Sequence, residues 1–114
     1  MRKMLLYTIT FVFLMACKTH KPSSTADAAS ACIKKSIENF SKTECDKNPN
    51  VKEYTFQGQK VFVFDPGQCG ADMTSEVFDK DCKSIGFLGG FEGNVKINGE
   101  DFSNALLVKT VWEK

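Results

Sequence analysis

Lys60-Val61-Phe62-Val63-Phe64-Asp65 is the stretch that decides how this chain folds. Successive side chains of a β-strand point to opposite faces, so Val61 and Val63 would lie on one face and Phe62 and Phe64 on the other. A short apolar run bounded by turn signals is typical of a strand that is buried on both sides. We therefore expect this strand in the middle of a sheet whose two faces are covered, one of them by a helix.

The segment from Ser30 to Lys42 has the apolar spacing of an amphipathic helix. Ile33, Ile37 and Phe40 recur at positions i, i+4 and i+7, and so form one apolar stripe. We expect this stripe to pack on one face of the sheet. A helix that binds a partner or lies on a membrane is the alternative.

Shorter alternating runs predict the strands beside the central one. Tyr54 and Phe56 share one face of a strand that begins at Val51, and Gln57-Gly58-Gln59 can reverse the chain before the central strand. Further runs with alternating apolar residues lie at 76–79, 82–88, 95–97 and 106–112. Asn98-Gly99, which follows the third of these runs, is a strong hairpin signal.

The last run would place Leu106, Val108 and Trp112 on one face of its strand and Leu107 and Val111 on the other. A helix followed by several strands is the order typical of segregated layers. We therefore predict an α+β fold, in which one N-terminal helix packs on a small, mainly antiparallel, disulfide-stabilised β-sheet of about four to six strands.

The first residues have the pattern of an exported bacterial lipoprotein. Met1-Arg2-Lys3 is a basic start, and residues 4–15 are almost wholly apolar, a run of signal-peptide length that is shorter than the roughly 20 residues needed to span a bilayer. Leu14-Met15-Ala16-Cys17 then forms a lipobox, in which the thiol accepts a diacylglyceryl group. We predict a signal peptide at 1–16 and lipidation of Cys17; the alternative is an uncleaved membrane anchor with an incidental cysteine.

The segment after Cys17 is polar, rich in small residues and without an apolar period. We expect residues 17–30 to form a lipidated, flexible tether for a single domain at 31–114. Several acyl chains, such as palmitate, hold a protein firmly on a bilayer because each buried CH₂ contributes roughly 0.8 kcal/mol. The predicted location is the bacterial cell envelope, with the domain facing the periplasm.

The charge balance argues against one class of partner. The chain has 15 Lys and Arg against 14 Asp and Glu, and removal of a signal peptide would take Arg2 and Lys3 away. The mature chain is therefore near neutral or slightly acidic, whereas nucleic-acid-binding proteins usually carry a basic patch, so we expect no nucleic-acid partner. The expected partners are the membrane, through the acyl anchor, and an unknown envelope protein or small ligand.

Besides Cys17, the chain has four cysteines: Cys32, Cys45, Cys69 and Cys82. Export implies an oxidising compartment, and four cysteines predict disulfides with three possible connectivities. Cys69 and Cys82 flank the run at 76–79 and could meet across a hairpin, which favours this pair and leaves Cys32 with Cys45. One disulfide with two free thiols is an alternative, and zinc is disfavoured because no CxxC pair occurs and the only histidine, His20, lies in the tether.

Two stretches resemble ligand-binding motifs without completing them. Leu88-Gly89-Gly90-Phe91-Glu92-Gly93 is glycine-rich like a phosphate loop, but the Lys-Ser/Thr ending and the following helix are missing, so bends in a sheet explain these glycines better. Glu76, Asp79 and Asp81 form an acidic cluster, but the glycine and the distal glutamate of a calcium loop are absent, which favours a solvated loop. We expect no metal and no cofactor.

Catalytic groups are scarce in the predicted domain. It has no histidine, which removes Ser-His and Cys-His nucleophile pairs. A thiol enzyme would need a free cysteine with a lowered pKa, for which Cys82 beside Lys83 is the least unsuitable position. We therefore expect no catalytic residue and a non-catalytic binding module, with 88–93 and 69–72 as its most irregular segments; a small envelope enzyme or thiol-redox protein is the alternative.

From Cys32 onward, the order of short motifs resembles a family of small Bacteroidota envelope lipoproteins of unassigned function, over most of residues 32–112. The motifs are Cys32-Ile33 opening a helix, a Tyr-x-Phe and Gln-Gly-Gln-Lys-Val hairpin, Val77-Phe78-Asp79 with Cys82, Gly89-Gly90-Phe91 with Gly93, Asp101-Phe102 and a closing Val-Trp. The family often has a double cysteine where this chain has Cys69-Gly70, and another cysteine near Gly86, and Cys45 is outside its pattern. The joint absence of the first two fits the loss of one bridge. The resemblance implies a domain of unknown function and supplies no activity.

Overall fold

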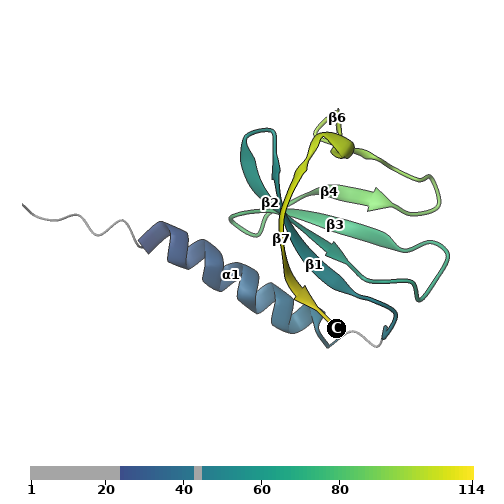
Figure 1. The fold of residues 1–114 in the computed structure, drawn as a ribbon, viewed down its shortest axis with the longest axis horizontal. Coiled ribbons are helices and arrows are strands. Elements are labelled where there is room, and N and C mark those ends of the chain that lie inside the picture. Colours follow the sequence, from purple (N-terminus) through teal and green to yellow (C-terminus); the bar gives the residue numbers. More distant parts are fainter. Residues whose placement is uncertain (1–23, 43–44) are drawn as a thin grey trace, which may run out of the picture.

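The computed structural model describes residues 24–42 and 45–114, which form one helix and a mainly antiparallel sheet (Figure 1). The elements are α1 (Ser24–Phe40), β1 (Asn50–Phe56), β2 (Gln59–Asp65), β3 (Thr74–Asp79), β4 (Ser84–Gly89), β5 (Lys96–Ile97), β6 (Glu100–Asp101), the 3₁₀ helix η1 (Phe102–Asn104) and β7 (Leu106–Glu113). Five strands form one sheet in the order β4-β3-β2-β1-β7 with every neighbouring pair antiparallel, and β5 and β6 form a separate hairpin. The predicted α+β fold is confirmed.

The central strand of the sheet is β2, and its four apolar side chains divide between two hydrophobic layers. Val61 and Val63 belong to a buried cluster that also includes side chains of β5 and η1. Phe62 and Phe64 belong to a second cluster on the opposite face, which α1 covers. Both the middle position of this strand and the burial of its two faces are therefore as predicted.

The helix packs on the sheet through its predicted stripe. Ile33 is buried in the second cluster, and Ile37 and Phe40 pack against it. The Phe40 ring meets the rings of Phe64 on β2 and Trp112 on β7 edge to face, with centroid separations of 5.3 and 5.8 Å. The helix thus lies over β7, β1 and β2, and Figure 1 shows it at the lower left of the sheet with β4 toward the upper right.

The helix begins at Ser24 rather than at Ser30, so the predicted start of the helix is wrong. The prediction relied on apolar spacing, and residues 24–29 have none. They include three alanines, which have the highest intrinsic helix propensity, and no glycine or proline. A helix can therefore extend there without an apolar stripe.

The two predicted reversals are confirmed. Gln57-Gly58 joins β1 to β2 and Asn98-Gly99 joins β5 to β6, and all four residues have positive φ angles. Positive φ at both central residues is the geometry of the two-residue turn that matches the twist of antiparallel strands. The second turn places Ile97, which is only 1% exposed, over the face of the sheet opposite α1.

The predicted alternation along the last strand is wrong. Two register shifts interrupt the pairing of β7 with β1, between Val51 and Lys52 and between Glu53 and Tyr54. They leave Val108 and Val111 without a paired residue on β1. Val111 and Trp112 consequently both pack in the layer under α1. Each bulge inserts an extra residue into the strand, so side chains on either side of it no longer alternate between the two faces.

The four domain cysteines form two disulfides, but the favoured pairing is wrong: Cys32 is bonded to Cys82, and Cys45 to Cys69. Cys69 precedes β3 and Cys82 follows it, so a strand of six residues, spanning roughly 20 Å, separates them. Cys32 likewise lies more than two helical turns before the end of α1, whereas Cys45 lies beyond it. Each cysteine therefore bonds to one from a different part of the chain.

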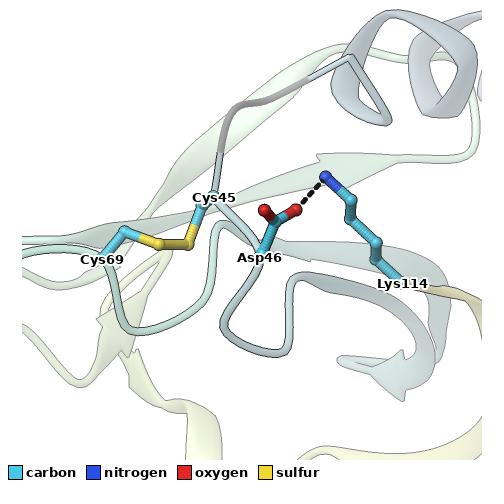
Figure 2. Close-up of polar contacts among 4 residues, drawn as sticks. All are labelled: Cys45, Asp46, Cys69 and Lys114. Carbon is cyan, nitrogen blue, oxygen red and sulfur yellow. Dashed lines mark ion pairs between the residues drawn. A yellow bond between two sulfur atoms is a disulfide. The ribbon is translucent and has the colours of Figure 1, made fainter.

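The Cys45–Cys69 disulfide fastens the segment that leads into β1 (Figure 2). Next to it, the Asp46 carboxylate forms an ion pair with Lys114 Nζ at 2.5 Å, and the Lys114 N–H donates to the Pro49 carbonyl at 3.1 Å. The ion pair is largely exposed, so it contributes little to stability. The disulfide fixes the segment before β1, and the backbone hydrogen bond to Pro49 holds Lys114 beside it.

The predicted signal peptide at 1–16, the lipidation site Cys17 and the tether residues 17–23 lie outside the described residues. Within 24–42 and 45–114, no helix combines the length and the apolar character needed to cross a membrane.

Candidate functional site

One row of side chains runs across the whole sheet on the face that α1 covers in part. Register pairs place these residues side by side, in the order Trp112, Val51, Phe64, Glu76 and Phe87, one from each strand from β7 to β4. Phe40 of α1 packs on the first half of this row. Glu76 and Phe87 lie beyond the helix, on β3 and β4, so this half of the sheet face is open to solvent.

The open half of this face forms a groove of about 310 Å³ between α1 and the outer strands. Its lining comes from the helix, β2, β3 and β4 and comprises Ser36, Phe40, Phe64, Pro66, Thr74, Glu76, Phe78 and Phe87. We call these residues the helix-side groove. Four of the eight are phenylalanines, and a largely apolar concave surface with a few polar groups is the usual composition of a ligand site.

Three of the phenylalanine rings of the helix-side groove pack against one another. Phe64 meets Phe40 and Phe78 edge to face, with centroid separations of 5.3 and 5.0 Å and interplanar angles of 88° and 75°. This is a favoured arrangement for aromatic pairs, worth about 0.5–1.5 kcal/mol each beyond their burial. Phe87 has no such ring partner within the described residues, and its side chain is 49% exposed. The groove therefore has a rigid floor and one accessible aromatic wall.

A disulfide fixes the helical side of this groove. Cys82 follows β3 with a positive φ of 61° and is bonded to Cys32 on α1. The turn that carries Cys82 is held by the Asp79 side chain, whose Oδ1 accepts from the N–H groups of Asp81 and Lys83, both at 2.9 Å. The distance between α1 and the end of β3 is thus set by a covalent bond and a hydrogen-bonded turn.

The two irregular segments that the sequence singles out lie together at one end of the groove. The Gly90 N–H donates to the Met73 carbonyl at 3.1 Å, which joins 88–93 to the start of β3, directly after 69–72. Phe91 projects from this loop and is 91% exposed, and Met73 is also exposed. The Gly93 N–H donates to the Gly90 carbonyl in a turn, and the strand β5 is the next element, so the structure agrees with bends rather than a phosphate loop.

Both edges of the sheet are poorly suited to adding a strand. On β4, Asn94 covers the end of the edge: its Nδ2 donates to the Phe87 carbonyl at 2.5 Å, and its backbone pairs with Gly89. On β7, the two bulges distort the edge, and Lys109 lies between them. Bulges and lysines are devices by which natural sheets avoid edge pairing. Exposed Leu106, Leu107 and Val108 lie on this bulged strand.

The predicted acidic cluster is divided between the two faces of the sheet. Glu76 lines the helix-side groove, whereas Asp79 and Asp81 line a separate hollow of about 230 Å³ at the turns after β1 and β3. Because its Oδ1 already accepts two backbone N–H groups, Asp79 has a structural role in the turn. No group of three His, Cys, Asp or Glu side chains suited to a metal ion occurs within 24–42 and 45–114.

A further carboxylate, Glu53 of β1, is buried on the face of the sheet that α1 covers. It is 6% exposed and forms an ion pair with Lys60 of β2, its Oε1 lying 3.6 Å from Lys60 Nζ. Lys109 of β7 is its register neighbour on the other side. A buried charge is costly unless it is paired, and the ion pair with Lys60 supplies that partner. We therefore assign Glu53 a structural role between β1 and its neighbouring strands.

A family model for a domain of unknown function, DUF6970, matches residues 38–114. The chain belongs to this family. The match includes every strand, three of the four disulfide cysteines and all of the helix-side groove except Ser36. Cys32 and most of α1 precede the DUF6970 match, so the Cys32–Cys82 bond fastens the helix to the family domain. No curated protein and no solved structure matches the chain.

Sequence reasoning missed the residues of the groove. It assigned Phe87 to the alternating run at 82–88 and Glu76 to an acidic cluster with Asp79 and Asp81, and it did not bring the two residues together. The signal that was present is the change from β2, which is apolar on both faces, to β3, which carries the Glu76 carboxylate on the face that α1 covers in part. That change marks where the covering layer ends, although only the direction of α1 shows which part of the face is left open.

Proposed function

We propose that this DUF6970 chain is a non-catalytic binding module that acyl groups on Cys17 hold on a membrane of the bacterial cell envelope. The observation that carries the proposal is the helix-side groove with Phe87 at its open side. A half-exposed phenylalanine beside three packed aromatic rings is costly to leave in water and gains stability when a ligand covers it. The groove contains no nucleophile paired with a base, and its one carboxylate, Glu76, lies among aromatic rings.

Two observations support the envelope location. The lipobox Leu14-Met15-Ala16-Cys17 follows a basic start and an apolar run of signal-peptide length. The four cysteines of the domain are bonded in pairs, and structural disulfides persist in oxidising compartments such as the periplasm. The same pairing leaves none of these four thiols free, which favours a binding module over a thiol enzyme.

The anchor is tested by labelling cells that express the full chain or its Cys17→Ser variant with a radioactive fatty acid. We expect the label on the parent protein only, and we expect the variant to leave the membrane pellet for the soluble fraction after signal cleavage. A parent without label, or a variant that sediments with membranes as firmly as the parent, would remove the anchor from the proposal.

The binding role is tested by photo-crosslinking in intact cells, with a photoreactive amino acid placed at Phe87. The matched control carries the probe at Val108, an apolar position of similar exposure, 53% against 49%, on the bulged strand β7. We expect a reproducible adduct from position 87 that is absent or weaker from position 108. Equal adducts from both positions, or none from either, would show that the groove is not the surface that binds.

A further inference from the structure

We infer that the helix-side groove binds an organic ammonium ion attached to an apolar body, an inference that rests on the proposed binding function and names its ligand class. Glu76 is paired in register with Phe64 on one side and with Phe87 on the other. Side chains that are directly opposite on neighbouring strands have Cβ atoms about 5 Å apart. The carboxylate therefore stands between two aromatic side chains, in a groove whose other rings are Phe40 and Phe78.

Aromatic rings around a carboxylate favour a cation that is itself weakly hydrated. The face of a phenylalanine ring attracts a cation within about 6 Å, and cages of such rings recognise quaternary and substituted ammonium groups. The Phe64 ring stands nearly perpendicular to those of Phe40 and Phe78, so the face of Phe64 points in a different direction from the faces of its two neighbours. Phe87 adds an accessible ring on the outer strand.

The charge of the groove is also of one sign. Glu76 is the one charged residue among the eight that line it. No lysine, arginine or histidine within 24–42 and 45–114 forms an ion pair with Glu76; the ion pairs there join Lys60 to Glu53 and Lys114 to Asp46. A cation that enters this groove therefore meets a carboxylate that has no competing salt bridge, and an anion would meet repulsion.

The volume limits the size of the ligand. About 310 Å³ is at the lower end of the range of roughly 300–1,000 Å³ for small-molecule sites. A choline or phenethylammonium ion fits this space, as does one lysine side chain of a peptide next to an apolar residue. The Ser36 and Thr74 hydroxyls, which line the same groove, can accept hydrogen bonds from a primary ammonium group.

The test is an NMR titration of the isotope-labelled full-length chain in a nonionic detergent. The probes are choline, phenethylamine and 3,3-dimethylbutanol, the last of which has the shape of choline without its charge. We expect choline and phenethylamine to shift the signals of Phe78, Phe87 and Ser36, and the neutral alcohol to bind at least about fivefold more weakly, the factor for one charge pair at 4 Å in water. Comparison with an N-acetyl-Phe-Lys-amide peptide assigns the source: tighter binding of the peptide indicates a lysine of a protein partner, and tighter binding of choline a small molecule.

A charge-removing variant provides the second arm. Glu76→Gln keeps the shape of the side chain and should weaken choline binding by at least about fivefold. Glu92→Gln, on the loop that holds Phe91 and outside the groove lining, is the matched control and should leave the affinity unchanged. Phe87→Leu keeps an apolar wall without the ring and should weaken choline by about threefold.

Equal affinities for choline and the neutral alcohol, or a Glu76→Gln variant that binds choline like the parent, would overturn the inference. The failure of the ligand class is distinguishable from the failure of the proposed function. If the cations leave the groove signals unmoved while position 87 still crosslinks a partner in cells, the groove binds something other than an ammonium ion. If position 87 gives no specific adduct, the binding function itself is wrong.

Discussion

The substitution Phe64→Ala should destabilise the domain strongly, because Phe64 joins the helix to the outer strands. It lies on the central strand, is 4% exposed, and packs edge to face with Phe40 of α1 and Phe78 of β3. Truncating a buried phenylalanine to alanine costs about 3–5 kcal/mol, through lost burial and the cavity left behind. Phe91→Ala is the matched control, because the same atoms are removed from a side chain that is 91% exposed. It should change the unfolding free energy by less than about 0.5 kcal/mol.

Urea unfolding followed by tryptophan fluorescence measures both changes, since the single tryptophan, Trp112, lies against Phe40 in the same layer. A domain of this size has a total stability of about 5–15 kcal/mol, so we expect the midpoint of the Phe64→Ala variant to fall by roughly a fifth or more. A loss below about 1 kcal/mol for Phe64→Ala would show that the layer between α1 and the sheet is not packed as described. Equal losses for Phe91→Ala and Phe64→Ala would show the same.

Three further predictions follow from other contacts. Replacing Cys32 and Cys82 together by serine should lower the unfolding free energy by about 4 kcal/mol, the chain-entropy value for a loop of 50 residues, measured by urea unfolding without reductant. Gly86→Ala should cost about 2 kcal/mol in the same assay, because Gly86 has a φ of +149° and a Cβ there would lie 2.8 Å from Ile97 Cδ1; a loss under 0.5 kcal/mol would contradict this close approach. Hydrogen bonding from the backbone N–H of Ser103 lowers the pKa of Asp101 below its ordinary value of 3.8. This carboxylate therefore stabilises the fold above pH 3.8, and its contribution is lost as the pH falls through the lowered pKa. A carboxyl NMR titration of Asp101 with a midpoint at or above 3.8 would refute this.

The elements that could be predicted from the sequence are those set by local periodicity. Val61-Phe62-Val63-Phe64 specifies a strand with two buried faces without reference to any other residue, and the structure places it at the centre of the sheet. Ile33, Ile37 and Phe40 likewise specify one helical stripe. Asn98-Gly99 specifies its hairpin because few residue pairs adopt positive φ angles at both positions.

The features that could not be predicted depend on partners distant in the sequence. The bulges at Val108 and Val111 exist only in the pairing of β7 with β1. The disulfide partners depend on which loops the strand order brings together, and proximity along the chain favoured the wrong pairs. The helix-side groove depends on the direction in which α1 crosses the sheet, since the same row of side chains is covered at Phe64 and open at Phe87.

The position of α1 is therefore the claim on which the groove depends, and the partner of Cys32 reports it most directly. Digestion of the unreduced protein at lysine separates the four domain cysteines into different peptides, because a lysine lies between each consecutive pair. Mass spectrometry should find the short peptide Asp81-Cys82-Lys83 linked to the peptide that contains Cys32. Its linkage instead to the peptide from Val61 to Lys80, which contains Cys69, would contradict the position of the helix and with it the open groove.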